Sequence, residues 1–511
     1  MPAPRRSGPT TLDLAWFVVA CSAYFVAMHA AANGWASSGI LSPSAAPGYW
    51  AAIDRAGLGG LARAPRGSGG GALGAIALAI AFAAMAASYG RLVLATLADA
   101  HGDAGDPRIG RWLGLVGVAA VPLLLAPQLL STDVYSYIVY GRMASVHGAN
   151  PYVHRPDALA TDPFLPLTFW NDTTMVYGPV WLYVTAAMTW VLERLGASLG
   201  AHVLAFKLLA LALHVGTALT IRAIARQLRP ARATTAMVAY LFNPLCLIEL
   251  VGNAHVDGLL VFLVLVGVHA HVRGRPVAAF AWLLLAALCK IQGLMFVGLY
   301  GLAWIRSAGS WRAACRRAAG LGGLGATVVI AAYAPVWAGA ATFDELLHGV
   351  PASRLLNSTA EALDRLGTGE AAARALTLTG FAIGAVVAIA RARTPAIAVR
   401  MFPWLGLGFC ALAATWFWPW YATLPVALAA AAGSRRALTV AIALSLTVLV
   451  VYVTFALGRP SGPLAAPIAL WDRYRAVTVF GPPALLALGL ARRGRWRRAS
   501  PAPAAPAPAP A

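Results

Sequence analysis

Long apolar runs separated by short polar segments make up most of the chain. A helix needs about 20 apolar residues to cross the hydrocarbon of a bilayer, although shorter or tilted helices also occur. By this criterion the pattern predicts about 14 membrane-spanning helices. In chain order they cover residues 13–33, 72–97, 112–130, 201–221, 233–251, 257–272, 276–289, 291–305, 318–339, 373–390, 400–417, 419–433, 437–456 and 476–491.

The composition agrees with this pattern. The chain has 511 residues, of which 60% are hydrophobic and 11% charged, and its mean hydropathy is +0.70. A water-soluble surface needs more charge than this. We therefore expect an all-α polytopic membrane protein.

The basic residues predict the orientation. Lys and Arg total 39 against 18 Asp and Glu, and the excess falls in short loops and near the C-terminus, as expected of cytoplasmic loops. Membrane orientation explains this charge better than nucleic-acid binding does. If residues 179–195 crossed the membrane, Arg222 to Arg232 would share a side with Asp133. We therefore place 179–195 at the interface or as a re-entrant segment, with both termini cytoplasmic and the polar loops outside.

The spans divide the chain into four parts. These are N-terminal membrane helices (1–130), an outer loop with interfacial helices (131–178), a membrane core (179–491) and a basic, then Ala/Pro-rich tail (492–511). The first apolar run also resembles a secretory signal peptide, but its length favours an uncleaved helix. The five cysteines are scattered without a C-x-x-C pair, so we expect neither a disulfide framework nor a zinc site.

Asp133 opens the outer loop and is the candidate catalytic base. It directly follows a span, at headgroup depth, where an ionisable group is costly unless it has a function. A simpler interpretation is that Asp133 caps the next helix. Tyr135, Tyr137 and Arg142 follow at helical spacing, so the segment predicts a surface helix whose aromatic rings stack on a sugar or anchor in headgroups.

Three further polar strings lie on the same predicted side. Asn150-Pro151-Tyr152 alone is a turn, and Tyr177-Gly178-Pro179 alone is a helix start with proline in its first turn. Asn253-x-His255-x-Asp257 fits a fragment of a metal site, a hydrogen-bonding site for substrate, or a helix cap.

Cations and aromatic residues complete the candidate site. Lys290, Lys207, Arg473 and Arg475 are placed to neutralise a lipid phosphate, or to lift their charges to the headgroups by snorkelling. Gln292 shares the hairpin of Lys290. The segment 416–421 is rich in Trp and Tyr, as interface belts are, and Trp420 and Tyr421 are candidates to line a sugar site.

Together these strings resemble the polyprenol-phosphate-dependent mannosyltransferases of the GT-C superfamily. Asp133-Val134-Tyr135-x-Tyr137, Gly148-x-Asn150-Pro151-Tyr152 and Tyr177-Gly178-Pro179 look like the family's first-outer-loop pattern. Asn243-Pro244 with Asn253-x-His255-x-Asp257 looks like the next block, and Lys290 and Trp418-Pro419-Trp420-Tyr421 look like later ones. The similarity runs from about residue 110 to 425, and the bacterial α-1,6-mannosyltransferases of lipomannan assembly look most similar.

The resemblance implies a GT-C-type helix bundle and an inverting transfer of a sugar, with mannose favoured. The donor would be a polyprenyl-phosphate sugar and the acceptor a glycan or glycolipid. Asp133 would take the acceptor proton, and Lys290 and Arg473 would stabilise the leaving phosphate. The sugar pocket would be shaped by Arg142, Tyr152, Asn253, His255 and Asp257. Because Asp133 is not doubled as in some relatives, the need for a divalent cation stays open; no metal ligands are assigned.

Two other functions remain as alternatives. A transporter or flippase also has many spans, but it keeps polar groups near the bilayer midplane and often shows internal repeats. Here the polar residues gather at one face. A lipid-linked glycan ligase or polymerase would transfer a whole glycan from a diphosphate carrier, and its outer loops should be mainly basic. The outer loops of this chain carry acids as well.

Overall fold

The structure is a computed structural model that describes residues 10–32, 70–98, 109–126, 130–349, 354–457 and 465–499. Every regular element within these ranges is a helix, and the bridges at Ala338–Ala340 and Leu356–Trp416 are isolated. The predicted all-α polytopic fold is confirmed. The tail predicted beyond residue 499 lies outside the described residues.

The α-helices in chain order are α1 (Thr11–Ala32), α4 (Gly70–Ala98), α5 (Ile109–Leu125), α6 (Asp133–Ser145), α7 (Pro179–Arg194), α8 (Leu199–Leu228), α9 (Ala233–Leu241), α10 (Pro244–Cys246), α11 (Asp257–Val272), α12 (Pro276–Cys289), α13 (Leu294–Arg306), α14 (Trp311–Tyr333), α15 (Asp344–His348), α17 (Thr359–Leu363), α18 (Glu370–Arg391), α19 (Pro395–Gly408), α20 (Thr423–Ala432), α21 (Arg435–Thr447), α22 (Val450–Leu457), α23 (Ala465–Arg473) and α24 (Arg475–Ala499). Short 3-10 turns cover Pro156–Ala158, Leu165–Leu167, Pro230–Arg232, Ile291–Gly293, Ala334–Val336, Ala341–Phe343 and Pro419–Ala422, and π-helical turns cover Leu247–Gly252, Asp364–Thr368 and Phe409–Ala413.

The described helices give fewer long spans than the sequence pattern suggested. Six are long and apolar enough to cross a membrane, or seven if one bent pair counts as a span. Several expected spans are shorter apolar helices, including α5, α11 and α12. The prediction of about 14 spans is therefore not confirmed. The segment 179–195 forms α7, which is not among the long apolar helices.

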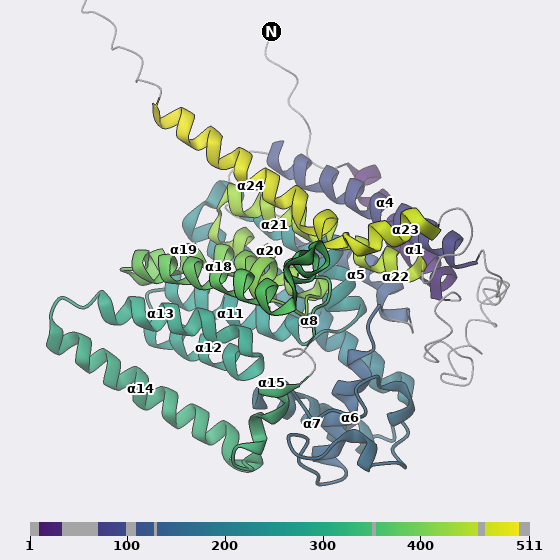
Figure 1. Ribbon diagram of the computed structural model, residues 1–511, viewed down its shortest axis with the longest axis horizontal. Helices are drawn as coiled ribbons and strands as arrows, with labels where there is room; N and C mark the ends of the chain where they lie inside the picture. Colours follow the sequence, from purple (N-terminus) through teal and green to yellow (C-terminus); the bar gives the residue numbers. More distant parts are fainter. Residues whose placement is uncertain are drawn as a thin grey trace, which may run out of the picture.

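Helix α8 lies at the centre of the bundle. It has 30 residues, and the hydroxyl of Ser198 caps its start by accepting from Ala201 N–H at 3.3 Å. Helices α5, α9, α11 and α20 pack around it, and α1 and α4 pack on each other beside α22 and α5 (Figure 1). A central helix with neighbours on many sides buries polar side chains that must find partners inside the protein.

The span predicted at 233–251 is broken. Residues 230–241 and 244–252 meet at an angle of 52°. Asn243 makes the break possible, because its side-chain Oδ1 accepts from Cys246 N–H at 3.2 Å and so caps the second piece. The second piece ends as a π-helical turn, Leu247–Gly252, and the chain then unwinds before α11. This unwound stretch carries Asn253 and His255.

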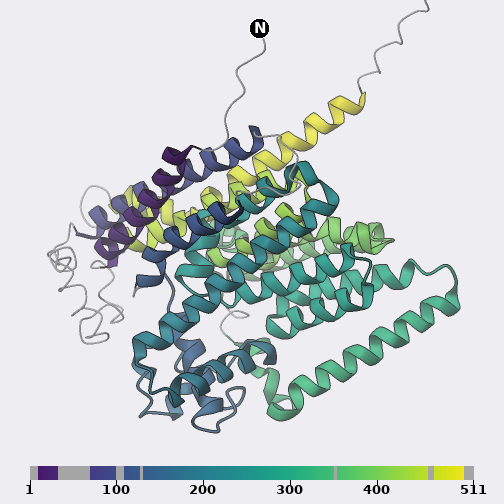
Figure 2. The same cartoon turned by 180° about the vertical axis from the view of Figure 1, so that it is seen from behind.

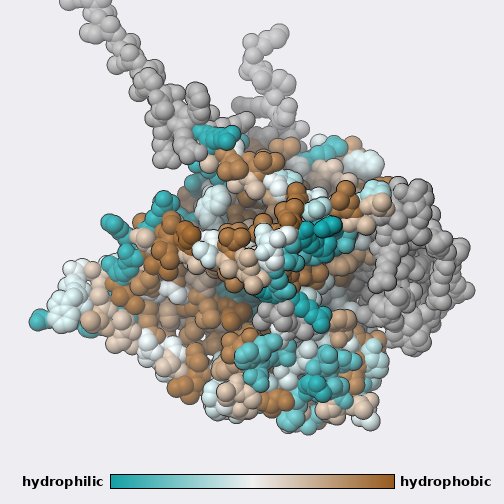
Figure 3. Space-filling model, in the orientation of Figure 1, coloured by the Kyte–Doolittle hydropathy of each residue, from teal (hydrophilic) through white to brown (hydrophobic). Residues whose placement is uncertain are grey.

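Helices α6 and α7 pack closely against each other at one end of the molecule. A Cβ at Gly141 would lie 2.7 Å from the carbonyl oxygen of Thr185, so only glycine permits this contact. Both views show α6 and α7 at the opposite side from the turn between α13 and α14 (Figures 1 and 2). Hydrophilic surface gathers over the region of α6, α7 and α15, while the middle of the molecule is largely hydrophobic (Figure 3).

Candidate active site

Asp133 lies in a buried polar cluster at the start of α6. Its side chain is about 10% exposed. Oδ1 accepts a hydrogen bond from Nε1 of Trp170 at 3.2 Å, and the backbone N–H of Asp133 donates to Ser131 Oγ at 3.3 Å. The residue at the helix cap is Thr132, and no side chain caps this helix start. The carboxylate of Asp133 therefore points into the cluster instead of closing the helix.

His255 joins Asp133 to a second carboxylate. Its Nδ1 lies 3.6 Å from Asp133 Oδ2, and its Nε2 lies 3.3 Å from Glu249 Oε2. The hydroxyl of Tyr137 lies 3.4 Å from the same Nδ1. The imidazole stacks on Trp420, with ring centroids 4.0 Å apart. Histidine is a common general acid or base, and this imidazole lies between two carboxylates, so it is a candidate for acid–base chemistry.

Glu249 and Asn253 tie the unwound stretch to the segment before α6. Asn253 Nδ2 donates to Glu249 Oε2 at 2.8 Å, and its Oδ1 accepts from Leu130 N–H at 2.9 Å. The hydroxyl of Tyr452 donates to Glu249 Oε1 at 2.5 Å. Ala254 adopts a positive φ of 54°, which costs a non-glycine residue energy and is often found at functional sites. The backbone here is held in a shape that aims His255 at Asp133.

Asp257 and Lys290 form a buried ion pair beside this cluster. Lys290 Nζ lies 2.7 Å from Asp257 Oδ2, and the two side chains are 8% and 3% exposed. The ammonium also lies 4.8 Å from the centroid of the Tyr421 ring and 5.9 Å from that of Tyr177. An ammonium has three N–H donors, so the contact with Asp257 leaves capacity for an anion.

Gly178 fixes Tyr177 against the end of α12. Its N–H donates to the carbonyl of Cys289 at 3.0 Å, and a Cβ at this position would overlap the carbonyl oxygen of Leu288. The carbonyl of Tyr177 accepts from Tyr152 OH at 2.8 Å. Because this position is glycine, the end of the outer loop can pack directly against Cys289, the residue before Lys290.

Asn150 holds the turn that precedes Tyr152. Its Oδ1 accepts from Tyr152 N–H at 3.1 Å, as in an Asx turn, and its Nδ2 donates to the carbonyl of Val336 at 2.8 Å. The second bond joins the outer loop to the end of α14. The turn predicted at Asn150-Pro151-Tyr152 is thus present, and it also makes a long-range contact.

The tyrosines of the cluster stay protonated. Burial and the charge of Asp133 raise the pKa of Tyr177 well above its ordinary value, and burial with the nearby Tyr177 and Asp133 does the same for Tyr137. Their rings meet edge to face, with centroids 5.3 Å apart. Neutral phenols beside a carboxylate are hydrogen-bond donors, so they can hold hydroxyl groups of a ligand.

A row of stacked rings leads from the cluster to Arg475. His255 stacks on Trp420, and Trp420 stacks on Trp418 with ring centroids 5.0 Å apart and an angle of 5° between the ring planes. Trp418 stacks on Phe455, with ring centroids 5.7 Å apart. The guanidinium of Arg475 lies 5.1 Å from the centroid of the Phe455 ring, and its Nη1 donates to Asp472 Oδ1 at 2.7 Å. The row connects the segment before α20, together with α22 and α24, to the unwound stretch.

Five of the predicted site residues gain no ligand role from their described contacts. Arg142 donates from Nε to Asp162 Oδ2 at 2.8 Å and pairs with Glu193, which joins α6 to the outer loop and to α7. Lys207 donates to the carbonyls of Leu123, at 2.9 Å, and Ala126, at the end of α5.

Arg473 is exposed and donates to the carbonyl of Arg365 at 3.2 Å. Gln292 lies in the turn after Lys290, and its Oε1 is buried with no hydrogen-bond partner among the residues that the structure describes. Tyr135 is buried on α6, and burial raises its pKa to about 12. The ligand roles predicted for Arg142, Lys207, Arg473, Gln292 and Tyr135 find no support in these contacts and stay predictions.

The structure adds two residues that the motifs did not single out. Trp170 binds the carboxylate of Asp133, and Tyr452 binds that of Glu249. Glu249 had a signal in the sequence, since it precedes Asn253 by one helical turn, and Trp418 of the late aromatic block extends the stack. Within the described part of the chain, no three His, Cys, Asp or Glu side chains converge as metal ligands, and metal dependence stays a prediction to be tested.

Comparison with known proteins points to one family. The chain is 31% identical over 222 residues to alpha-(1->6)-mannopyranosyltransferase A of Corynebacterium glutamicum, covering 42% of each chain. It is 30% identical over 198 residues to alpha-(1->6)-mannopyranosyltransferase A of Mycobacterium tuberculosis, covering 36% of this chain and 34% of that one. Alpha-(1->6)-mannopyranosyltransferase B of C. glutamicum matches at 26% identity over 209 residues, covering 37% of this chain and 34% of that one.

The matched part thus spans about two fifths or less of each relative. A search of the solved structures found no significant match. The family model described as "Alpha-(1->6)-mannopyranosyltransferase, N-terminal domain" matches residues 31–306, a range that contains Asp133, His255 and Lys290 and exceeds half of the chain. The chain therefore belongs to the alpha-(1->6)-mannopyranosyltransferase family, and the resemblance predicted from its motifs is confirmed.

Proposed function

We propose that the protein transfers mannose from a polyprenyl-phosphate donor to a hydroxyl group of a glycan or glycolipid acceptor, at the outer face of a bacterial plasma membrane. The observation that carries the proposal is the buried cluster in which Asp133, His255 and the Asp257–Lys290 pair meet. The names of the matched relatives support the reaction class. The excess of basic residues in the loops opposite this cluster supports an extracytoplasmic site.

Asp133 is the proposed base. The acceptor hydroxyl loses its proton to the carboxylate while its oxygen forms a bond to the anomeric carbon of the sugar. The bond from that carbon to the phosphate oxygen breaks, and polyprenyl phosphate leaves with the electron pair. Attack from the face opposite the phosphate inverts the anomeric configuration. Trp170 orients the carboxylate through its hydrogen bond, and His255 lies close enough to share the proton.

Lys290 is the proposed partner of the leaving phosphate. Its charge would offset the negative charge that develops on the phosphate oxygen, in a buried site where such stabilisation is strong. Asp257 holds the ammonium in place. Arg475 lies at the far end of the ring stack that begins at His255, whereas Arg473 is exposed, so Arg475 is the better placed of these two arginines to bind the carrier.

The neutral tyrosines and the amide groups would shape the sugar pocket. Tyr137 and Tyr177 offer hydroxyl donors next to Asp133, and the flat face of Trp420 offers a surface for the C–H groups of a sugar. Asn253, which binds Glu249, would hold this wall of the pocket in shape. Tyr152 would fix the loop that closes it.

The test is transfer of radiolabelled mannose from polyprenyl-phosphate mannose into membrane lipid or glycan. Asp133→Asn keeps the shape and removes the base, and we expect the rate to fall by about 100-fold or more. Asp157→Asn is the matched control, because Asp157 is an exposed acid of the same outer loop, paired only with Arg155. Unchanged transfer by Asp133→Asn would remove Asp133 as the base. No transfer by the wild type would reject the donor or the reaction. Treatment with a chelator in the same assay tests for a metal.

A further inference from the structure

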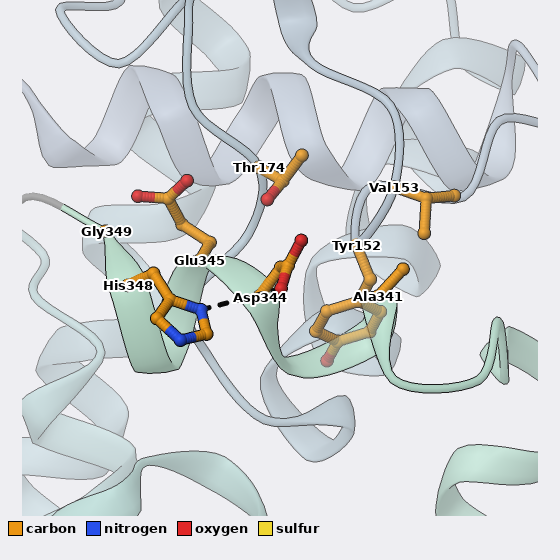
Figure 4. Close-up of a pocket in the computed structure, with 8 residues that line it drawn as sticks. All are labelled: Tyr152, Val153, Thr174, Ala341, Asp344, Glu345, His348 and Gly349. Carbon is orange, nitrogen blue, oxygen red and sulfur yellow. Dashed lines mark ion pairs between the residues drawn. The ribbon is translucent and has the colours of Figure 1, made fainter.

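A cavity of about 520 Å³ opens between the outer loop and α15 (Figure 4). Asp344, Glu345 and His348 of α15 lie on one side of it, and Tyr152 and Thr174 lie across from them. Its volume is within the range of roughly 300–1,000 Å³ typical of small-molecule sites. None of the acids or the histidine that line it belongs to the cluster around Asp133.

The lining suits a neutral, hydroxyl-rich ligand. Two carboxylates accept from neighbouring hydroxyl groups, and Thr174 and His348 can both donate and accept. His348 Nδ1 lies 3.5 Å from Asp344 Oδ1. Tyr152 also lines the cavity, as a buried residue that packs against Tyr333. The two acids would repel a phosphate group, and the described residues offer no set of three metal ligands.

The cavity is connected to Asp133 by two tyrosines. Tyr140 lies on α6, two turns after Asp133, or about 10 Å along the helix, and its hydroxyl donates to the carbonyl of Thr173 at 3.1 Å, next to the cavity wall. Tyr152 lines the cavity while its hydroxyl donates to the carbonyl of Tyr177 at 2.8 Å. Residues of α6 and of the outer loop thus link the wall of the cavity to the cluster around Asp133.

We propose that this cavity is an acceptor subsite, which binds a sugar residue of the acceptor that does not react. The terminal sugar of the acceptor would then present its hydroxyl group to Asp133, while a preceding sugar is held by Glu345, Asp344 and Thr174. The enzyme would thus extend chains of two or more sugars better than it glycosylates a single sugar on a lipid. This inference rests on the proposed function for its acceptor chemistry.

Binding tests the subsite without catalysis. The probe is α-1,6-linked mannotriose, added to the purified full chain in detergent, and saturation-transfer NMR measures its binding. We expect Glu345→Gln and Asp344→Asn each to weaken binding about 10-fold, the loss expected for one hydrogen bond to a charged group. Asp157→Asn should bind as the wild type does. Equal binding by all variants, no binding by the wild type, or tighter binding of mannose 6-phosphate would each overturn the subsite.

Steady-state kinetics distinguish a failure of the subsite proposal from a failure of the proposed function. With polyprenyl-phosphate mannose as donor, the wild type should have a lower KM for a trisaccharide acceptor than for a single-sugar glycolipid. The two cavity variants should reduce this preference about 10-fold, while the KM for the donor stays constant. A wild type that transfers to both acceptors with equal KM contradicts the subsite alone. A wild type that transfers to neither contradicts the proposed function, and the binding measurement still decides the subsite.

Discussion

At the scale of single residues, the cluster is a set of charges that hold one another in place. Glu249 and Asp257 are almost completely buried, and each has a hydrogen-bonded partner, Asn253 or Lys290. Burying a charge without a partner costs several kcal/mol, so such pairs are fixed in position. Asp133 is the exception, because its carboxylate accepts a hydrogen bond from a tryptophan N–H and only approaches a histidine ring, at 3.6 Å. Lone pairs of this carboxylate are therefore left for an acceptor hydroxyl group.

Trp170 offers a direct test of how Asp133 is oriented. Trp170→Phe keeps an aromatic ring and removes the N–H that donates to Oδ1. We expect transfer to fall about 10-fold, because a hydrogen bond to a charged group contributes roughly 1.5–3 kcal/mol. Trp190→Phe, at an exposed position on α7, is the control and should keep full activity. If both variants transfer mannose at the same rate, the hydrogen bond from Trp170 does not orient the base.

Arg142 should matter for stability. Arg142→Met leaves the buried carboxylate of Asp162 without its main partner, and breaking a buried pair in this way costs about 3–5 kcal/mol. Limited proteolysis of the outer loop, measured against temperature, should show the loss. Arg155→Met breaks an exposed pair with Asp157 and should cost about 1 kcal/mol or less. Equal effects of the two variants would contradict the structural role of Arg142.

At the scale of elements, a broken helix builds the site. A continuous helix over 233–251 would have run past the cluster. The chain could not turn inside such a helix, because its backbone groups would all be hydrogen-bonded within the helix. The bend of 52° and the π-helical turn instead bring Glu249 and the unwound residues to α6. Irregular backbone at membrane depth is tolerated only where protein covers it, and residues 245–260 are buried throughout. The break in this helix therefore places His255 in the site, and regular helical hydrogen bonding is lost there.

Gly178 tests the contact between two elements. Gly178→Ala forces the start of α7 away from the end of α12, because the new methyl group would overlap the Leu288 carbonyl. Overpacking of this kind costs roughly 1–3 kcal/mol, and the displacement would move Lys290 relative to Asp133. We expect lower transfer and a lower melting temperature. Gly200→Ala is the control, since nothing lies within 4 Å of its Cβ position; a similar loss there would mean that the contact at Gly178 is not the cause.

At the scale of the whole molecule, the polar outer loop and the basic start of α14 lie at opposite sides. The unit of α6, α7 and α15 lies at one side, and the turn between α13 and α14 lies at the other. Helix α14 has 23 residues, or about 35 Å of helix, enough to cross the hydrocarbon of about 30 Å. Arg312, Arg316 and Arg317 near its start favour a cytoplasmic position for that end.

Labelling of cysteines checks this orientation. Cys315 is exposed near the start of α14, whereas the four other cysteines are buried. An impermeant maleimide should therefore label the wild type only after the cells are opened. Arg155→Cys, at an exposed site of the outer loop, should be labelled in intact cells. Labelling of Cys315 in intact cells would reverse the proposed orientation and place the cluster on the cytoplasmic side.

The positions of several site residues could be predicted, but their partners could not. Asp133, His255, Asp257 and Lys290 were proposed from the motifs, and the structure brings all four together. Arg142 and Lys207 were proposed from the sequence as well. In the structure, however, Arg142 binds the carboxylate of Asp162, and Lys207 donates to backbone carbonyls. A pattern gives the type and spacing of residues along the chain. It does not give the neighbours that arrive from distant segments, such as Trp170 and Tyr452.

The sequence by itself determined the helical membrane fold and the family, because apolar runs and short motifs are local properties of the chain. Only the tertiary structure decided how the long spans divide into complete, short and broken helices, since a break such as that at Asn243 depends on what packs around it. The tertiary structure alone likewise brings Glu249 to Tyr452 and the outer loop to α15. These contacts link residues far apart in the chain, and packing brings them together.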